Sequence, residues 1–188
     1  TLNANNGVIG SGTLRVTGEI FSIGPTGGNN FGNTIAANFD LGGGTQVVRT
    51  GVPASFGLNT AVMFTGVVSN GSLFKTIGYS SNGVQANTDG ISLHNNNTYT
   101  GSTVLNGGQS LMSGTNATSS IKLTGFFGGA GATALSLAGA NGSAQGATLI
   151  QVFEAATFVL DNNATFGNPP NAQPFVPAAQ NNDRIRDD

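Results

Sequence analysis

Hydrophobic residues in this chain come in short runs, each bounded by glycine, asparagine or serine. Glycine interrupts every long window, and a glycine inside a helix costs about 1 kcal/mol relative to alanine, so the pattern disfavours helices. Within the runs, apolar and small polar residues alternate: Leu14 and Val16 share one face, and Ile121 and Leu123 lie opposite Lys122. A period of two residues is typical of a strand with one buried face. The chain is therefore predicted to be all-β.

The last of these runs leaves a second interpretation open. In Ala147–Leu160 the apolar residues also fall at the i, i+3, i+4 spacing of an amphipathic helix. Because Val, Ile, Thr and Phe dominate this segment, we predict two strands. The predicted strands, in chain order, lie within Gly12–Gly18, Glu19–Gly24, Asn33–Gly42, Thr45–Gly51, Thr60–Ser69, Ser72–Gly78, Gly90–His94, Ser102–Gly107, Gln109–Gly114, Ser120–Phe127, Thr133–Gly139, Ala147–Ala155 and Ala156–Asp161.

Many short strands with polar corners fit a sandwich, a barrel or a solenoid, and the composition favours the solenoid. Only 7% of residues are charged, while 30 are glycine and about two dozen are asparagine. Glycine and asparagine adopt the positive φ angles of tight corners, and stacked asparagine and threonine side chains can hydrogen-bond from one coil to the next. We therefore predict a right-handed parallel β-helix with about 20 residues per turn and about eight or nine turns.

The chain divides into a β-solenoid domain, 1–167, and a segment 168–188 that is read as an extended tail or a link to a further repeat. Four of the six prolines lie in this last segment. Because the sequence opens at Thr1 and closes on "NNDRIRDD", we expect an excerpt of a longer chain or a processed product.

The stretch Phe64–Gly114 contains "VVSNGSLFK" and, further on, "NTYTGSTVLNGGQSL". It resembles the passenger-associated β-strand repeat of bacterial autotransporters and related surface proteins. The matching residues are Gly66, Val68, Ser69, Gly71, Leu73, Lys75, Asn97, Tyr99, Thr100, Gly101, Thr103, Val104, Gly107, Gly108 and Leu111. The resemblance implies an extracellular β-solenoid on the bacterial surface, structural or adhesive, with a loop inserted around Tyr79–Asp89.

Several function classes are disfavoured by composition. Six basic residues without a cluster do not form the stripe that nucleic acid or an anionic membrane surface requires. The chain has no cysteine, which excludes disulfides and thiolate metal sites. The glycine-rich runs lack the Gly-Lys-Ser/Thr of a phosphate loop, and the calcium-binding nonapeptide is missing. We expect no cofactor, no metal and no insertion of this segment into a membrane.

Candidate catalytic residues are few. His94, the sole histidine, would need Asp89 and a serine such as Ser92 for a triad, and otherwise it is a turn residue. Eight scattered carboxylates do not form the cluster of a β-helical lyase or hydrolase, so the chain is predicted not to be an enzyme.

The candidate interaction surface consists of Phe126, Phe127, Tyr79 and Tyr99. Phe126 and Phe127 are adjacent, so both cannot point inward from one strand. We expect a structural protein that forms homo-oligomers or filaments through the ends or faces of the solenoid. The alternatives are an adhesin or glycan-binding domain that uses the polar face and the loop at Tyr79–Asp89, and a polysaccharide lyase or hydrolase.

Overall fold

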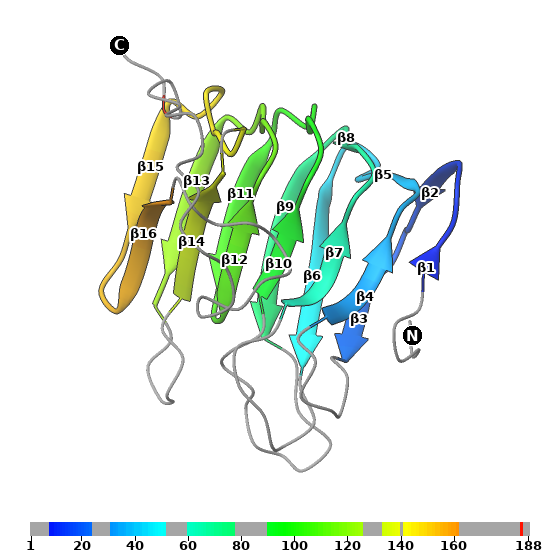
Figure 1. The fold of residues 1–188 in the computed structure, drawn as a ribbon, viewed down its shortest axis with the longest axis horizontal. Coiled ribbons are helices and arrows are strands. Elements are labelled where there is room, and N and C mark those ends of the chain that lie inside the picture. The colour runs from blue at the N-terminus through cyan, green and yellow to red at the C-terminus, as the bar shows by residue number, and fades with distance from the viewer. Residues whose placement is uncertain are drawn as a thin grey trace.

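The computed structural model describes residues 8–23, 31–51, 60–77, 90–125, 133–139, 141–161 and 185. All regular elements in these ranges are β-strands, and they form three parallel sheets (Figure 1). The seven-stranded sheet contains β1 (Val8–Ile9), β4 (Phe31–Ile35), β7 (Thr60–Phe64), β10 (Gly90–Leu93), β12 (Gln109–Met112), β14 (Thr133–Ala138) and β16 (Ala156–Asp161). The six-stranded sheet contains β3 (Ile20–Ile23), β6 (Thr45–Gly51), β9 (Ser72–Ile77), β11 (Ser102–Asn106), β13 (Ser120–Thr124) and β15 (Leu149–Val152). The three-stranded sheet contains β2 (Thr13–Arg15), β5 (Asn38–Asp40) and β8 (Val68–Ser69).

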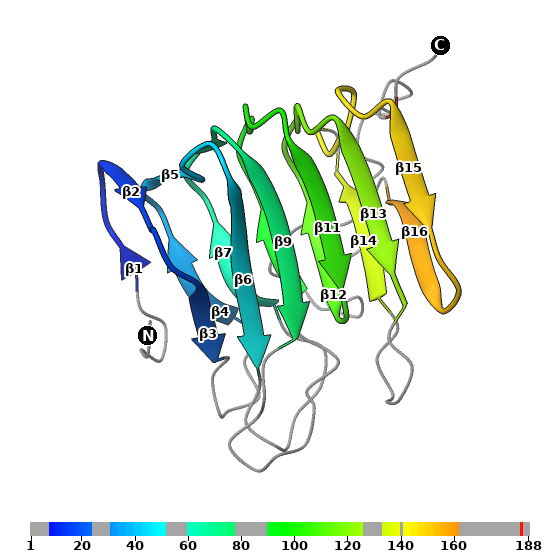
Figure 2. The same cartoon turned by 180° about the vertical axis from the view of Figure 1, so that it is seen from behind.

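Successive strands belong to the sheets in a fixed order. Each coil passes from the seven-stranded to the three-stranded and then to the six-stranded sheet, as β1, β2 and β3 do. From β10 onward, isolated parallel bridges such as Asn97–Asn116 take the place of the three-stranded sheet. In Figure 2 the six-stranded sheet lies in front with its strands pointing down, and the chain advances from left to right. The molecule is therefore a right-handed parallel β-helix, as the sequence predicts.

The coils are longer and fewer than predicted. Along the six-stranded sheet, Thr103 pairs with Ile121 after 18 residues, but Phe74 pairs with Val104 after 30. That sheet holds six strands and the other large sheet seven, where about eight or nine turns were expected. The reason is that most coils carry extra residues between the six-stranded sheet and the following strand of the seven-stranded sheet.

The core follows the predicted alternation. Ile121 and Leu123 on β13 are fully buried while Lys122 between them is exposed. Phe39 and Phe64 are buried with their ring centroids 5.2 Å apart. Residues 147–160 form the strands β15 and β16, which confirms the strand interpretation over the helix.

Asparagine connects the coils where the third sheet ends. The side-chain oxygen of Asn97 accepts a hydrogen bond from the Val68 amide at 2.8 Å, and its amide group donates to the Asn116 oxygen at 3.0 Å. Asn116 in turn donates to the backbone carbonyl of Ser143 at 3.2 Å. Both asparagines are buried. The predicted hydrogen-bonded ladder is thus present, and it substitutes for strand pairing on this face.

Candidate interaction surfaces

One edge of the solenoid collects the long connections. It lies where β3, β6, β9 and β13 end and where β4, β7, β10 and β14 begin, and we call it the loop-bearing edge (Figures 1 and 2). In sequence, these strand ends flank residues 24–30, 52–59, 78–89 and 126–132, which lie outside the described residues. Tyr79, Phe126 and Phe127 belong to two of them and lie outside the described residues. In repeat proteins, insertions that share one face are frequently the binding face.

A tight corner at the same edge separates β11 from β12. Gly107 and Gly108 turn the chain with φ of 75° and 73°, a conformation that strains any residue with a Cβ atom. The Gly107 amide donates to the Thr133 hydroxyl at 2.8 Å, and that hydroxyl donates to the Thr124 carbonyl at 2.6 Å. The corner is therefore held to the next coil by side-chain hydrogen bonds.

Lys75 lies beneath this corner, inside the solenoid. Its side chain is fully buried in line with Val48 and Leu105, and its ammonium group donates to the carbonyls of Asn106, at 3.3 Å, and Gly107. A buried charge requires such polar partners. The period-two alternation that places Leu73 inward also places Lys75 inward. This alternation is the sequence signal from which the burial of Lys75 could have been predicted.

Tyr99 belongs to the core and not to a surface. Its ring is fully buried, and its hydroxyl lies 2.7 Å from the Thr103 hydroxyl, which donates to Thr118 at 3.0 Å. Because the single Thr103 proton is used toward Thr118, Tyr99 acts as the donor. Burial raises the pKa of the Tyr99 phenol. The expectation that Tyr99 helps form an interaction surface is therefore corrected.

The histidine pairs with a serine that the sequence did not single out. His94 Nδ1 lies 2.9 Å from the Ser113 hydroxyl, one coil later. Ser92 is fully buried on β10, and Asp89 lies outside the described residues. Burial lowers the pKa of His94 to about 4, whereas a general base works best with a pKa near the operating pH. The pair therefore fits a contact between coils better than catalysis.

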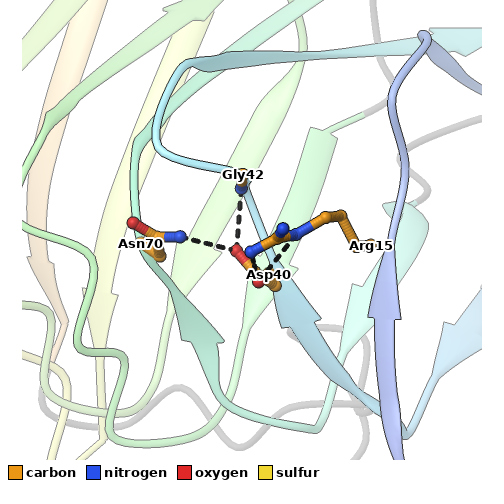
Figure 3. A network of polar contacts seen from close by, with 4 residues as sticks. All are labelled: Arg15, Asp40, Gly42 and Asn70. Atoms are coloured by element: carbon orange, nitrogen blue, oxygen red, sulfur yellow. Dashed lines mark hydrogen bonds and ion pairs between the residues drawn. The ribbon is translucent and has the colours of Figure 1, made fainter.

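Two of the carboxylates in the described ranges are tied to arginines across coils. Asp40 accepts hydrogen bonds from the Gly42 amide at 2.8 Å, from Arg15 Nε at 2.9 Å and from the Asn70 amide group at 3.0 Å (Figure 3). The hydrogen bond from the Gly42 amide holds the pKa of Asp40 below its usual value, and the hydrogen bond from Arg15 lowers that pKa further. Arg49 Nε donates to a carboxylate oxygen of Glu19 at 2.6 Å, and this hydrogen bond lowers the pKa of Glu19. These carboxylates brace neighbouring coils.

Among the described residues, no three His, Asp or Glu side chains come close enough together to hold a metal ion. These ranges also contain no helix that is long and apolar enough to cross a membrane.

At the C-terminal end of the described solenoid, two side chains of the inward-facing ladder are exposed, and Ile185 bridges Ala144 on the third-sheet side. The register aligns Val152 with the buried Leu123, and Leu160 with the buried Leu137. Val152 and Leu160 nevertheless expose 47% and 56% of their surfaces. Leu149 and Phe153 are exposed as well, but on the outer face: Leu149 pairs with Ser120, and the Phe153 ring lies 5.0 Å from the ammonium group of the exposed Lys122. We call Val152 and Leu160 the end patch, and sequence alternation alone could not reveal it because the same pattern is buried in inner coils.

Comparisons with known proteins identify no relative of this chain: no family model, no curated protein and no solved structure matches it. The parallel β-solenoid is therefore the part of the resemblance that the structure supports, and membership of the autotransporter repeat family stays a proposal.

Proposed function

We propose that this chain is a non-catalytic structural protein, an extracellular β-solenoid of the bacterial cell surface that associates with further copies of itself. The observation that carries the proposal is the end patch, where the ladder of inward-facing side chains continues into solvent at Val152 and Leu160. Open solenoid ends must be capped or must join another chain, because their strands and apolar side chains otherwise lack partners.

The outer faces support a structural role. Their carboxylates at Glu19 and Asp40 are engaged by arginines of the neighbouring coil, and the low charge avoids stacked like charges. The surface location follows from the resemblance of Phe64–Gly114 to bacterial passenger repeats. It is also compatible with a chain that has no cysteine to be trapped by oxidation during export.

Electron microscopy of the purified chain at rising concentration tests this function. We expect fibres, layers or defined small assemblies in negative stain. Particles that remain single solenoids at every concentration would contradict association. Fractionation of the source bacterium tests the location, and recovery of the chain in the cytoplasm would contradict a surface role.

The loop-bearing edge favours a second candidate function, adhesion through glycan binding. Loops on a rigid scaffold are common sites of recognition. A glycan array tests this alternative with Tyr79→Ala, which changes the sequence between β9 and β10, and Thr98→Ala, which changes an exposed residue on the third-sheet side, as a matched control. Binding lost only in Tyr79→Ala supports adhesion, and an array without hits removes it.

A further inference from the structure

The outer face of the six-stranded sheet, in front in Figure 2, carries a row of side chains that runs from coil to coil. Taken in register across β3, β6, β9, β11 and β13, the row consists of Glu19, Val47, Phe74, Val104 and Lys122. Glu19 comes directly before β3, whose first residue pairs with the residue directly after Val47. Each of the five is next in sequence to a buried core residue, so each points outward. We call them the outer row.

The outer row has a charge at each end and apolar residues between them. Val47, Phe74 and Val104 are partly exposed, and Glu19 and Lys122 are exposed. The row is therefore negative in the coil of β3, apolar in the next three coils, and positive in the coil of β13. Read from either end, the apolar part is the same: valine, phenylalanine, valine.

The carboxylate of Glu19 can accept one more donor. Arg49 donates to both of its oxygens, at 2.6 and 3.0 Å, yet 50% of the Glu19 side chain is exposed. A carboxylate has about four acceptor positions, so a second cation can bind beside Arg49. Lys122 is such a cation, and within the described ranges it forms no ion pair; its ammonium group lies over the Phe153 ring at 5.0 Å.

We propose that a second copy of this chain packs face to face on this sheet. The two copies are related by a two-fold axis that lies in the interface, runs parallel to the strands and passes by Phe74. This axis reverses the row, so Glu19 of each copy lies opposite Lys122 of the other. Val47 lies opposite Val104, and Phe74 meets its counterpart on the axis. Aligned sheets pack in this way about 10 Å apart, and a contact that uses the same patch on both copies closes as a dimer.

Other face-to-face arrangements match the charges less well. A two-fold axis along the solenoid keeps the direction of the row, so Glu19 meets Glu19 and Lys122 meets Lys122. Like charges that face each other across an interface are costly. An axis parallel to the strands but placed between β9 and β11 puts Lys122 opposite Val47 and removes the ion pairs. The axis at β9 is the arrangement of these three that pairs both charges and all apolar residues.

Sedimentation over about 10 µM to 1 mM tests the dimer. Five strands about 4.8 Å apart and about 17 Å long cover roughly 400 Å² per copy, half of a standard interface, so the affinity is low. We expect a dimer of the 18.8 kDa chain, and Phe74→Thr should raise its dissociation constant by about tenfold or more. Leu149→Thr is the matched control: Leu149 is exposed on the outer face of β15, which has no counterpart strand in this arrangement, so little effect is expected. Circular dichroism shows that each variant is folded.

Charge exchange tests the reversed row. Lys122→Glu alone, and Glu19→Lys alone, should each weaken the dimer, because like charges then meet at both ends of the row. A double variant with both substitutions should dimerise more tightly than either single variant, because opposite charges meet again. A double variant that is no tighter than the single variants overturns this arrangement.

This inference rests on the association part of the proposed function and adds a lateral contact that is separate from the end patch. Leu160→Lys, which changes the end patch, distinguishes the two. Association that is lost in Leu160→Lys but unchanged in Phe74→Thr overturns the lateral contact while supporting the proposed function. Single solenoids at every concentration overturn both.

Discussion

At the scale of single residues, buried polar groups in this solenoid act between coils. Asn97 satisfies the backbone of the preceding coil through Val68 and the side chain of the next through Asn116. A buried amide left without its partner costs about 1–3 kcal/mol. Removing such a residue should therefore lower the free energy of unfolding more than removing an exposed residue of the same type.

Asn97→Ala should therefore lower the free energy of unfolding by about 2–3 kcal/mol, because the Val68 amide and the Asn116 oxygen both lose a buried partner. Urea denaturation measures the change. Asn96→Ala is the matched control, since Asn96 is exposed and accepts its bond from the Thr115 hydroxyl; we expect a change within about 0.5 kcal/mol. Equal effects in the two variants would contradict a special role for the buried ladder.

His94 should make stability depend on pH. Its pKa falls from 6.5 to about 4 on folding, so between these values the unfolded chain binds a proton that the folded chain does not. Stability is then highest above pH 6.5 and decreases as the pH falls toward 4. Because the ring is partly exposed, solvent screening reduces the effect to about 1–2 kcal/mol.

The comparison of wild type with His94→Gln isolates this contribution from the carboxylates, which also titrate in acid. The difference in unfolding free energy between the two proteins should vary over this pH window and stay constant above it. A constant difference at every pH would show that His94 does not titrate as proposed.

At the scale of elements, corners decide how each coil is closed. The β11–β12 connection consists of two successive residues at positive φ, Gly107 and Gly108. The β15–β16 connection has three residues, and the other connections at the loop-bearing edge have seven or more. A side chain in this left-handed conformation costs roughly 1–2 kcal/mol. The coil with the tightest corner should consequently tolerate substitution least.

Gly108→Ala should destabilise the protein by about 1–2 kcal/mol, because its φ of 73° disfavours a Cβ atom. Thermal unfolding measures the loss. Gly44→Ala is the control, because a Cβ atom there meets no atom within 4 Å. A loss at Gly44 as large as that at Gly108 would mean that backbone conformation is not the cause.

At the scale of the whole molecule, each coil contacts its neighbours above and below, so stability is distributed along one dimension. Inner coils such as the one with β11 are covered on both sides, while β1 and β2 have a neighbour on one side among the described residues. Terminal coils of such arrays open more easily than central ones.

Native-state hydrogen exchange should therefore show a gradient of protection. Amides of β11 and β13 should exchange at least about a hundredfold more slowly than those of β2, because their opening requires two interfaces to separate. Mass spectrometry of peptic fragments measures the rates. Uniform protection from β2 to β13 would indicate that the solenoid opens as a single cooperative unit.

Strands, their buried faces and the solenoid class were predictable because they depend on local signals. Period-two alternation assigned Ile121 and Leu123 to the core, and glycine and asparagine marked the corners. The corners inside Asn33–Gly42 and Thr60–Ser69 were missed: Ala36 and Ala37 continue the first run through its bend, and Gly66 alone marks the second.

Stacking partners were decided by the tertiary structure alone. Coils of 18 to 30 residues bring together groups whose separation in sequence follows no fixed repeat, such as His94 with Ser113 and Lys75 with Gly107. Tyr99 is buried for the same reason, because its depth depends on the coils on either side of it. Alternation thus determined which way a side chain points, whereas the stacking of coils determined whether another coil covers it, as the exposed Leu160 shows.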